Sequence, residues 1–141
     1  MKQVIGIWML LTILFLTGCQ EETKQDETAS NPSSTEETTA VYRKINPEEA
    51  KNMMTEEGIL IIDVREQSEF DDGYIPGATL LPVGLIDAGD LSLLPDKDQK
   101  ILVYCRSGNR SGKAAKKLVE YGYTQVYDFG GIMDWPYEIV K

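Results

Sequence analysis

The hydrophobic and polar positions divide the chain into three stretches. Residues 4–16 are apolar apart from Gly6 and Thr12. Residues 20–40 are polar, with six acidic residues, one lysine and no large apolar side chain. After that, short apolar runs alternate with charged segments, a pattern typical of a globular domain. The length of 141 residues favours a single folded domain, which we expect over residues 42–141.

Two apolar runs in this domain are continuous rather than alternating. They are ILIIDV (residues 59–64) and KILVYC (residues 100–105). Continuous runs of this length, rich in β-branched residues, are typical of strands that are buried on both faces of a parallel sheet. Shorter strands are expected at Ala78–Leu81 and at residues 124–129.

Helical patterns lie between these strands. Asn46 is expected to cap a helix N-terminus, with Pro47 as the first helical residue. Apolar residues at helical spacing in residues 109–121, followed by Gly122, predict a second helix and its C-terminal cap. Single helical turns are expected within residues 66–73 and 85–99. Strands that alternate with helices predict an α/β domain with a mainly parallel sheet.

The apolar stretch at the N-terminus is too short for a comfortable membrane span, which needs about 20 apolar residues. Behind the positive charge of Lys2, it fits the core of a signal peptide, which is about 7–15 residues long. The sequence LTGC that follows, residues 16–19, resembles the lipobox of bacterial lipoproteins. This resemblance implies a signal peptide over residues 1–18 and a mature protein that begins with a lipidated Cys19.

Lipidation of Cys19 with acyl chains such as palmitate would anchor the protein stably in a membrane. We therefore expect an exported protein that is held at the cell membrane and faces outside the cytoplasm. The alternatives are an ordinary signal peptide or an uncleaved anchor, with Cys19 incidental. Residues 19–41 are too polar to bury enough surface to offset their ordering entropy, so we expect a disordered acidic linker. The net charge of −9 argues against a nucleic-acid partner.

The strongest chemical signal is Cys105, which ends the second apolar run and is followed by RSGNR. The chain has no histidine to act as a base for this thiol. Gly108 allows consecutive backbone N–H groups to turn inward as an anion-binding nest, and the following helix adds the positive end of its dipole. Arg106 and Arg110 add permanent positive charge. Such a loop can lower the pKa of the thiol and hold an oxyanion or a persulfide sulfur. The alternative is that Cys105 is a small buried hydrophobe at a strand end.

The segment VYCRSGNRSGKAAKKLVEYGYTQVYDFGGIMDW (103–135) resembles the active-site half of the rhodanese family, single-domain type. The segment LIIDVREQSEFDDGYIPGATLLP (60–82) is similar to the N-terminal signature of that family. The match covers about residues 42–137. It implies a rhodanese-like fold, with a mainly parallel sheet and helices on both faces. It also implies a sulfurtransferase that moves a sulfane sulfur from a thiosulfate-like donor to a thiol or cyanide-like acceptor.

The resemblance implies a role for each matching residue. Cys105 is the catalytic nucleophile that carries the persulfide, and no cofactor or metal is expected. Arg110 is expected at the oxyanion of the donor, with Arg106 bracing the loop. Asp63 and Arg65 are expected as structural support, in an ordinary surface salt bridge or with Arg65 paired to a carboxylate such as Glu69. The substrate-binding loop comprises Arg106, Ser107, Gly108, Asn109 and Arg110.

One position departs from the family pattern. Tyr74 stands where the family usually has a histidine. Because that histidine is not the general base of sulfur transfer, we expect activity to be retained.

The sequence around Cys105 excludes some alternatives to sulfur transfer and leaves others open. A phosphatase needs five residues between its cysteine and arginine, whereas Cys105 and Arg110 are separated by four, and arsenate reduction meets the same objection. A histidine-dependent cysteine protease is excluded. The open alternative is a sulfur carrier without turnover, or a redox or reactive-sulfur sensor, that serves a protein partner through the same cysteine. Turnover with a small acceptor would discriminate between these functions.

Overall fold

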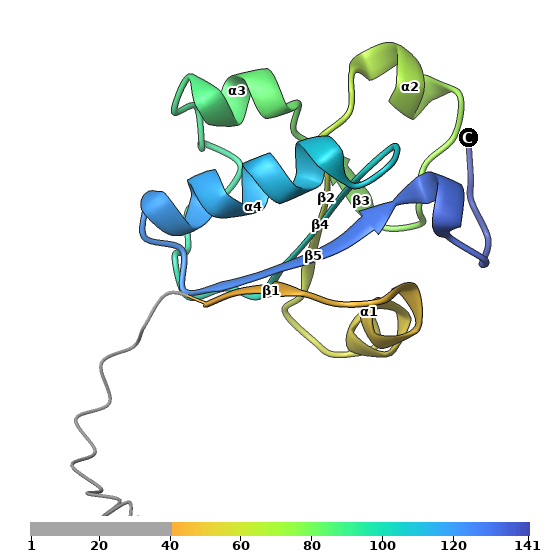
Figure 1. Ribbon diagram of the computed structural model, residues 1–141, viewed down its shortest axis with the longest axis horizontal. Coiled ribbons are helices and arrows are strands. Elements are labelled where there is room, and N and C mark those ends of the chain that lie inside the picture. Colours follow the sequence, from red (N-terminus) through yellow and green to blue (C-terminus); the bar gives the residue numbers. More distant parts are fainter. Residues whose placement is uncertain (1–40) are drawn as a thin grey trace, which may run out of the picture. The chain divides into compact units, whose positions relative to one another are not determined.

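The computed structural model describes residues 41–141, which build a five-stranded sheet in the order β1-β5-β4-β2-β3 (Figure 1). All four strand pairs are parallel, which confirms the predicted α/β class. The site-bearing strand β4 is central and all of its residues are buried. The strands are β1 (Val41–Lys44), β2 (Leu60–Asp63), β3 (Ala78–Leu80), β4 (Ile101–Cys105) and β5 (Gln125–Gly131).

Helices cover both faces of this sheet. Figure 1 shows α3 and α4 over one face and α1 under the other. Each face has its own hydrophobic cluster, built around Val103 and Leu118 on the α4 side and around Leu102 and Phe129 on the α1 side. The helices are α1 (Pro47–Met53), α2 (Gln67–Asp71), α3 (Val83–Asp87), α4 (Asn109–Glu120) and a short 3-10 helix, η1 (Ile132–Asp134).

The helix caps follow the sequence prediction. The side chain of Asn46 accepts a hydrogen bond of 2.8 Å from the backbone N–H of Glu49, and Pro47 is the first residue of α1. At the other cap, Gly122 has a φ of 89° directly after the last turn of α4. In α4, the buried positions recur at helical spacing against the sheet and α3: Ser111, Ala114, Ala115 and Leu118.

The sequence patterns did not predict one of the five strands. Strand β1 was not predicted, because VYRK contains only two apolar residues and lies at the edge of the sheet. Its pairing partner β5 supplies the register, with Tyr42 beside Val126. In this edge strand the side chains of Arg43 and Lys44 are exposed, so it needs less apolar sequence than a central strand.

A bulge in β5 shapes the end of β4. Val103 pairs with Asp128, but Cys105 pairs with Gly131, so β5 carries one extra residue over this interval. Gly130 has a φ of 92°, which accommodates the bulge. A side chain at Gly131 would collide with the carbonyl oxygen of Arg106 and would lie 2.6 Å from the Cα of Ser107. The segment after β4 therefore packs directly on bare backbone.

Replacing Gly131 with alanine should lower the free energy of unfolding by about 1–3 kcal/mol, because the new methyl group meets backbone atoms that cannot rotate away. Urea denaturation of the two proteins measures this difference. Gly84→Ala in α3 is the matched control, since its methyl group would meet open space, and it should leave stability unchanged or raise it. Equal stability of Gly131→Ala and the unaltered protein would contradict the close contact.

Candidate active site

Cys105 is the last residue of β4, and α4 begins at Asn109. The cysteine is only 1% exposed. Between the two elements, Gly108 has a φ of 92° and ends the loop in the left-handed conformation that precedes the helix. The structure thus has the strand, glycine turn and helix that the sequence predicted around this cysteine.

Hydrogen bonds meet at the sulfur of Cys105. The backbone N–H of Gly108 donates to Sγ at 3.1 Å, and the thiol donates to the hydroxyl oxygen of Ser111 at 3.7 Å. Burial raises the pKa of the thiol, but hydrogen bonds from Ser111, Ser107 and Gly108 together outweigh burial. The pKa of Cys105 is therefore lowered without a histidine, by the loop itself.

Ser111 is a site residue that the sequence analysis missed. It is fully buried in the first turn of α4, and its hydroxyl lies 3.2 Å from the carbonyl oxygens of both Gly108 and Gly130, to either of which it can donate. Ser111 thus connects the cysteine loop, α4 and the bulge of β5. The available signal was a small hydroxyl residue in the first helical turn after a cysteine at a strand end.

Asp128 stabilises the same bulge through a hydrogen bond to the backbone. Its side chain is buried in β5, and its Oδ1 accepts a hydrogen bond of 3.0 Å from the backbone N–H of Gly130. Burial, together with this carboxylate, raises the pKa of the neighbouring Tyr42. Asp128 therefore holds the backbone on which the cysteine loop rests.

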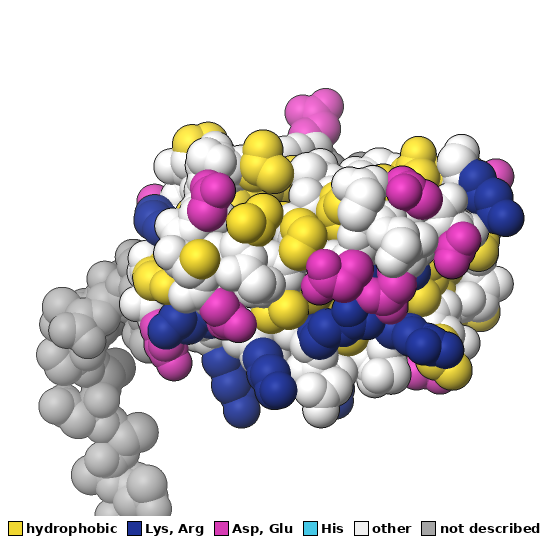
Figure 2. All heavy atoms as spheres, turned by 90° about the horizontal axis from the view of Figure 1, so that it is seen from above, with side chains coloured by type: hydrophobic (Ala, Val, Ile, Leu, Met, Phe, Trp, Pro, Cys, Tyr) yellow, Lys and Arg dark blue, Asp and Glu magenta, His cyan; other side chains and the backbone are white. Residues whose placement is uncertain are grey.

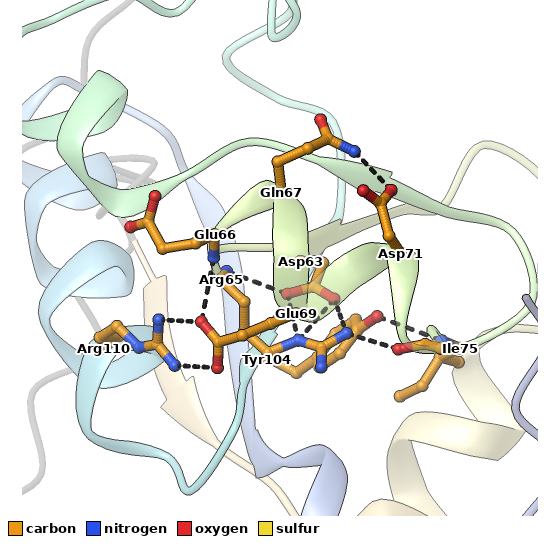
Figure 3. A network of polar contacts seen from close by, with 10 residues as sticks. Asp63, Arg65, Glu66, Gln67, Glu69, Asp71, Ile75, Tyr104 and Arg110 are labelled. Atoms are coloured by element: carbon orange, nitrogen blue, oxygen red, sulfur yellow. Dashed lines mark hydrogen bonds and ion pairs between the residues drawn. The ribbon is translucent and has the colours of Figure 1, made fainter.

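The two arginines of the loop have different surroundings. Arg110 forms a bidentate ion pair with Glu69 of α2, with N–O distances of 2.6 and 2.7 Å (Figure 3). These hydrogen bonds are the main reason that the pKa of Glu69 falls to about 2. Arg106 is exposed and has no ion pair within residues 41–141. Arg110 therefore makes the bracing contact that was expected of Arg106, through Glu69, whereas Arg106 is open to solvent.

A hollow of about 320 Å³ opens beside this loop. Of the two loop arginines, Arg106 is the one that lines the hollow. The side chains of Ser107 and Asn109 are also exposed along the loop. The hollow is lined by Arg65, Glu69, Asp72, Arg106, Ile132 and Met133.

The support residues Asp63 and Arg65 form a buried pair. The Arg65 Nη2 lies 2.6 Å from Asp63 Oδ2 and also donates to the carbonyl oxygen of Gly73 at 2.8 Å. The backbone N–H of Arg65 bonds to the same carboxylate at 3.0 Å, so the chain folds back on itself at the end of β2. The expected partner Glu69 and the expected surface location of this pair are therefore both wrong. Figure 3 shows Glu69 turned toward Arg110.

Tyr74 has a packing role at the position where a histidine was expected from the family. Its ring stacks on Phe70 with a centroid separation of 4.1 Å. Its backbone pairs with Val140, with hydrogen bonds of 2.8 Å in both directions. Tyr74 therefore ties the C-terminal segment to the region after α2.

The lipidation site predicted at Cys19 and the signal peptide predicted over residues 1–18 lie outside the described residues. Within residues 41–141, no helix is long and apolar enough to cross a membrane. The same residues contain no cluster of His, Cys, Asp or Glu side chains that could hold a metal ion.

Comparison with known proteins identifies the family of this chain. Residues 46–137 match the family model described as Rhodanese-like domain. A sulfurtransferase of Allochromatium vinosum is 41% identical over 80 residues, which cover 56% of this chain and 73% of that relative. Thiosulfate sulfurtransferase GlpE of Coxiella burnetii is 33% identical over 96 residues, covering 67% of this chain and 88% of that relative.

A solved structure agrees with these sequence relatives. The structure described as "rhodanese with anions from E. coli" has a TM-score of 0.54 and 34% sequence identity, and the alignment covers 59% of this chain and 98% of that one. The resemblance drawn from the two sequence segments is confirmed. The chain therefore belongs to the rhodanese-like domain family and is a sulfurtransferase of the rhodanese type.

Proposed function

We propose that this sulfurtransferase moves a sulfane sulfur from thiosulfate, or a similar donor, to a thiophilic acceptor through a persulfide on Cys105. The observation that carries this proposal is a buried sulfur with a lowered pKa that accepts a hydrogen bond from the backbone N–H of Gly108 and lies beside the Ser111 hydroxyl. Hydrogen bonds from the loop favour negative charge at Sγ, the charge that a reactive thiolate carries. The relative from Coxiella burnetii, named a thiosulfate sulfurtransferase, supports the choice of donor.

The reaction proceeds in two balanced steps. The Cys105 thiolate attacks the outer sulfur of thiosulfate, a new S–S bond forms, and sulfite leaves with the electron pair of the broken S–S bond. The acceptor, a thiolate or cyanide, then attacks the outer sulfur of the persulfide. The S–S bond to Cys105 breaks, Cys105 keeps the electron pair, and the acceptor leaves as a persulfide or as thiocyanate. No oxidant or reductant is consumed, and the cysteine returns to its starting state.

The two loop arginines have different roles in the proposed reaction. Arg106 faces the hollow without an ion pair among the described residues, so its guanidinium is placed to bind the oxyanion of the donor. Arg110 is fixed by Glu69 and holds the start of α4 in register with α2. Attraction to Cys105 also raises the pKa of Arg110, after the larger effect of Glu69, so its positive charge favours the thiolate.

The LTGC sequence supports a location for this activity. We place the enzyme outside the cytoplasm, at the cell membrane, with the domain carried on a lipid attached to Cys19. The acidic segment that follows Cys19 would then act as the spacer between the membrane and the domain.

Replacing Cys105 with serine should abolish sulfur loading, because serine cannot form a persulfide. Intact-mass measurement of the full-length chain before and after exposure to thiosulfate would show the gain of one sulfur atom, removable by cyanide, in the unaltered protein and not in Cys105→Ser. Cys19→Ala is the matched control, since it leaves Cys105 as the remaining cysteine and should still load. If Cys105→Ser gains sulfur to the same extent as the unaltered protein, the proposed mechanism is wrong. A Cys105 that reacts with alkylating reagents but never loads would indicate a redox or sensing role instead.

Ser111→Ala should raise the pKa of the Cys105 thiol, because the variant loses one of the hydrogen bonds that lower this pKa. The rate of alkylation of Cys105 by iodoacetamide, followed against pH, should therefore reach its plateau at higher pH. Above the pKa of both proteins the rates should converge, which separates a change of ionisation from a change of access. Ser107→Ala is the control, since it keeps the backbone donor and should reproduce the original profile. A Ser111→Ala profile identical to that of the unaltered protein would refute this role of the hydroxyl.

Cys19→Ala should prevent lipidation, so that the expressed protein accumulates without the acyl mass and leaves the membrane fraction. Fractionation of expressing cells and mass measurement of the N-terminus test both effects. The anchor proposal fails if the Cys19→Ala protein is still processed after Gly18 and remains bound to the membrane.

A further inference from the structure

The charges of the folded domain are unevenly distributed. Residues 41–141 contain twelve Lys and Arg residues against seventeen Asp and Glu residues. Five of these cations and none of these acids lie within residues 106–119, the cysteine loop and most of α4. The rest of the domain is therefore strongly acidic, whereas the element next to the active site is basic.

Three of these cations form what we call the basic edge: Arg106, Lys113 and Lys116. All three are exposed, and the two lysines lie one turn apart on the face of α4 opposite its buried alanines. Figure 2 shows several dark blue side chains along the lower edge of the molecule, with acidic side chains beside some of them and above them.

The cations of the basic edge make no ion pair or cation–π contact within residues 41–141. Elsewhere in residues 41–141, most cations pair with carboxylates, as Lys100 does with Glu56 at 2.6 Å, or lie over aromatic rings, as Lys97 does over Tyr123 at 3.8 Å; the exposed Lys44 and Lys141 do neither. Within the same residues, the cations of the basic edge have neither an ion pair nor an aromatic ring. Like charges at this helical spacing repel one another, so folding stability does not explain them.

We infer that the basic edge docks an acidic protein that bears a thiol, and that this protein is the sulfur acceptor; the inference rests on the proposed function. An acidic surface is attracted to this edge, which increases the association rate and orients the partner. Because the edge begins at Arg106, directly after Cys105, the docked protein presents its thiol to the loaded sulfur. The acceptor thiolate attacks the outer sulfur, Cys105 keeps the electrons of the broken S–S bond, and the acceptor leaves as a persulfide.

The size of the edge favours a protein over a small donor. Lys113 and Lys116 lie about 6 and 10 Å along the helix axis from its first residue, Asn109. That separation puts them outside the reach of a thiosulfate ion at Cys105, but within the area of about 800 Å² that one partner contributes to a protein interface. A lipid surface on this edge would cover the hollow beside Arg106 and block the entry of the donor.

Transfer from the loaded full-length chain to thiol peptides tests this inference. The acceptors are a cysteine peptide flanked by glutamates, the same peptide with glutamines, and dithiothreitol. The glutamate peptide should react faster than the glutamine peptide, and salt should remove the difference. The double variant Lys113→Glu/Lys116→Glu should lose about tenfold in rate toward the glutamate peptide alone. Its loading by thiosulfate and its transfer to dithiothreitol should be unchanged.

The matched control carries the same change of net charge elsewhere. Lys51→Glu/Lys97→Glu places the new charges in α1, on the opposite face of the sheet, and in the loop before β4. This variant should keep the rate toward the glutamate peptide. If both double variants lose the same fraction of the rate toward the glutamate peptide, the inference is overturned, because the net charge of the protein would then explain the loss.

Three other results would also overturn it. The first is an unchanged rate of Lys113→Glu/Lys116→Glu toward the glutamate peptide. The second is a parallel loss of loading by thiosulfate, which would assign the edge to the donor. The third is unchanged transfer with lost binding to phosphatidylglycerol vesicles, which would assign the edge to a membrane.

A binding measurement separates this inference from the proposed function. Fluorescence anisotropy of the glutamate peptide with serine in place of cysteine requires no persulfide. Binding that is weakened about tenfold by Lys113→Glu/Lys116→Glu, and not by the control, supports the docking surface even if thiosulfate fails to load Cys105. Equal binding to both variants overturns the docking surface even if loading succeeds.

Discussion

The hydrogen bonds that converge on the buried sulfur of Cys105 are the interaction on which the rest of the site depends. Burial alone would disfavour a thiolate, and the chain has no histidine to share the proton. The donors reach Sγ only because the loop is tight, and the loop is tight because Gly108 adopts a left-handed conformation and Gly131 leaves room for backbone. The bulge of β5 is therefore as much a part of the active site as the residues that follow the cysteine.

Two ion pairs hold the carboxyl edge of the sheet together around this loop. Glu69 with Arg110 joins α2 to α4, and Asp63 with Arg65 joins the end of β2 to the segment after α2 through the carbonyl of Gly73. The buried pair is fully engaged in hydrogen bonds, which is the condition under which buried charges are tolerated. Because both arginines of these pairs are held by carboxylates, the remaining positive charge on this side of the domain comes from Arg106 and the lysines of α4.

Local sequence signals predicted the parts of the structure that local chemistry determines. The cap at Asn46, the buried strands around Ile62 and Val103, and the glycine turn before α4 all follow from short patterns. The partner of Arg110 could not be read in this way, because Glu69 lies 41 residues away and many carboxylates were available. Strand β1 and the bulge at Gly130 depend on pairing with a distant strand, and the role of Ser111 depends on the carbonyl that β5 brings to it.

The burial of Cys105 has a consequence for the order of events in the catalytic cycle. A thiol that is 1% exposed cannot meet a bulky thiol or disulfide at its own sulfur without opening of the loop. In the proposed cycle, a persulfide would extend the side chain of Cys105 by one S–S bond, about 2 Å. The empty enzyme would then be shielded from mixed disulfides with large molecules, whereas the loaded enzyme would present its outer sulfur to them. Reaction with a large acceptor would in this way depend on prior loading with sulfur.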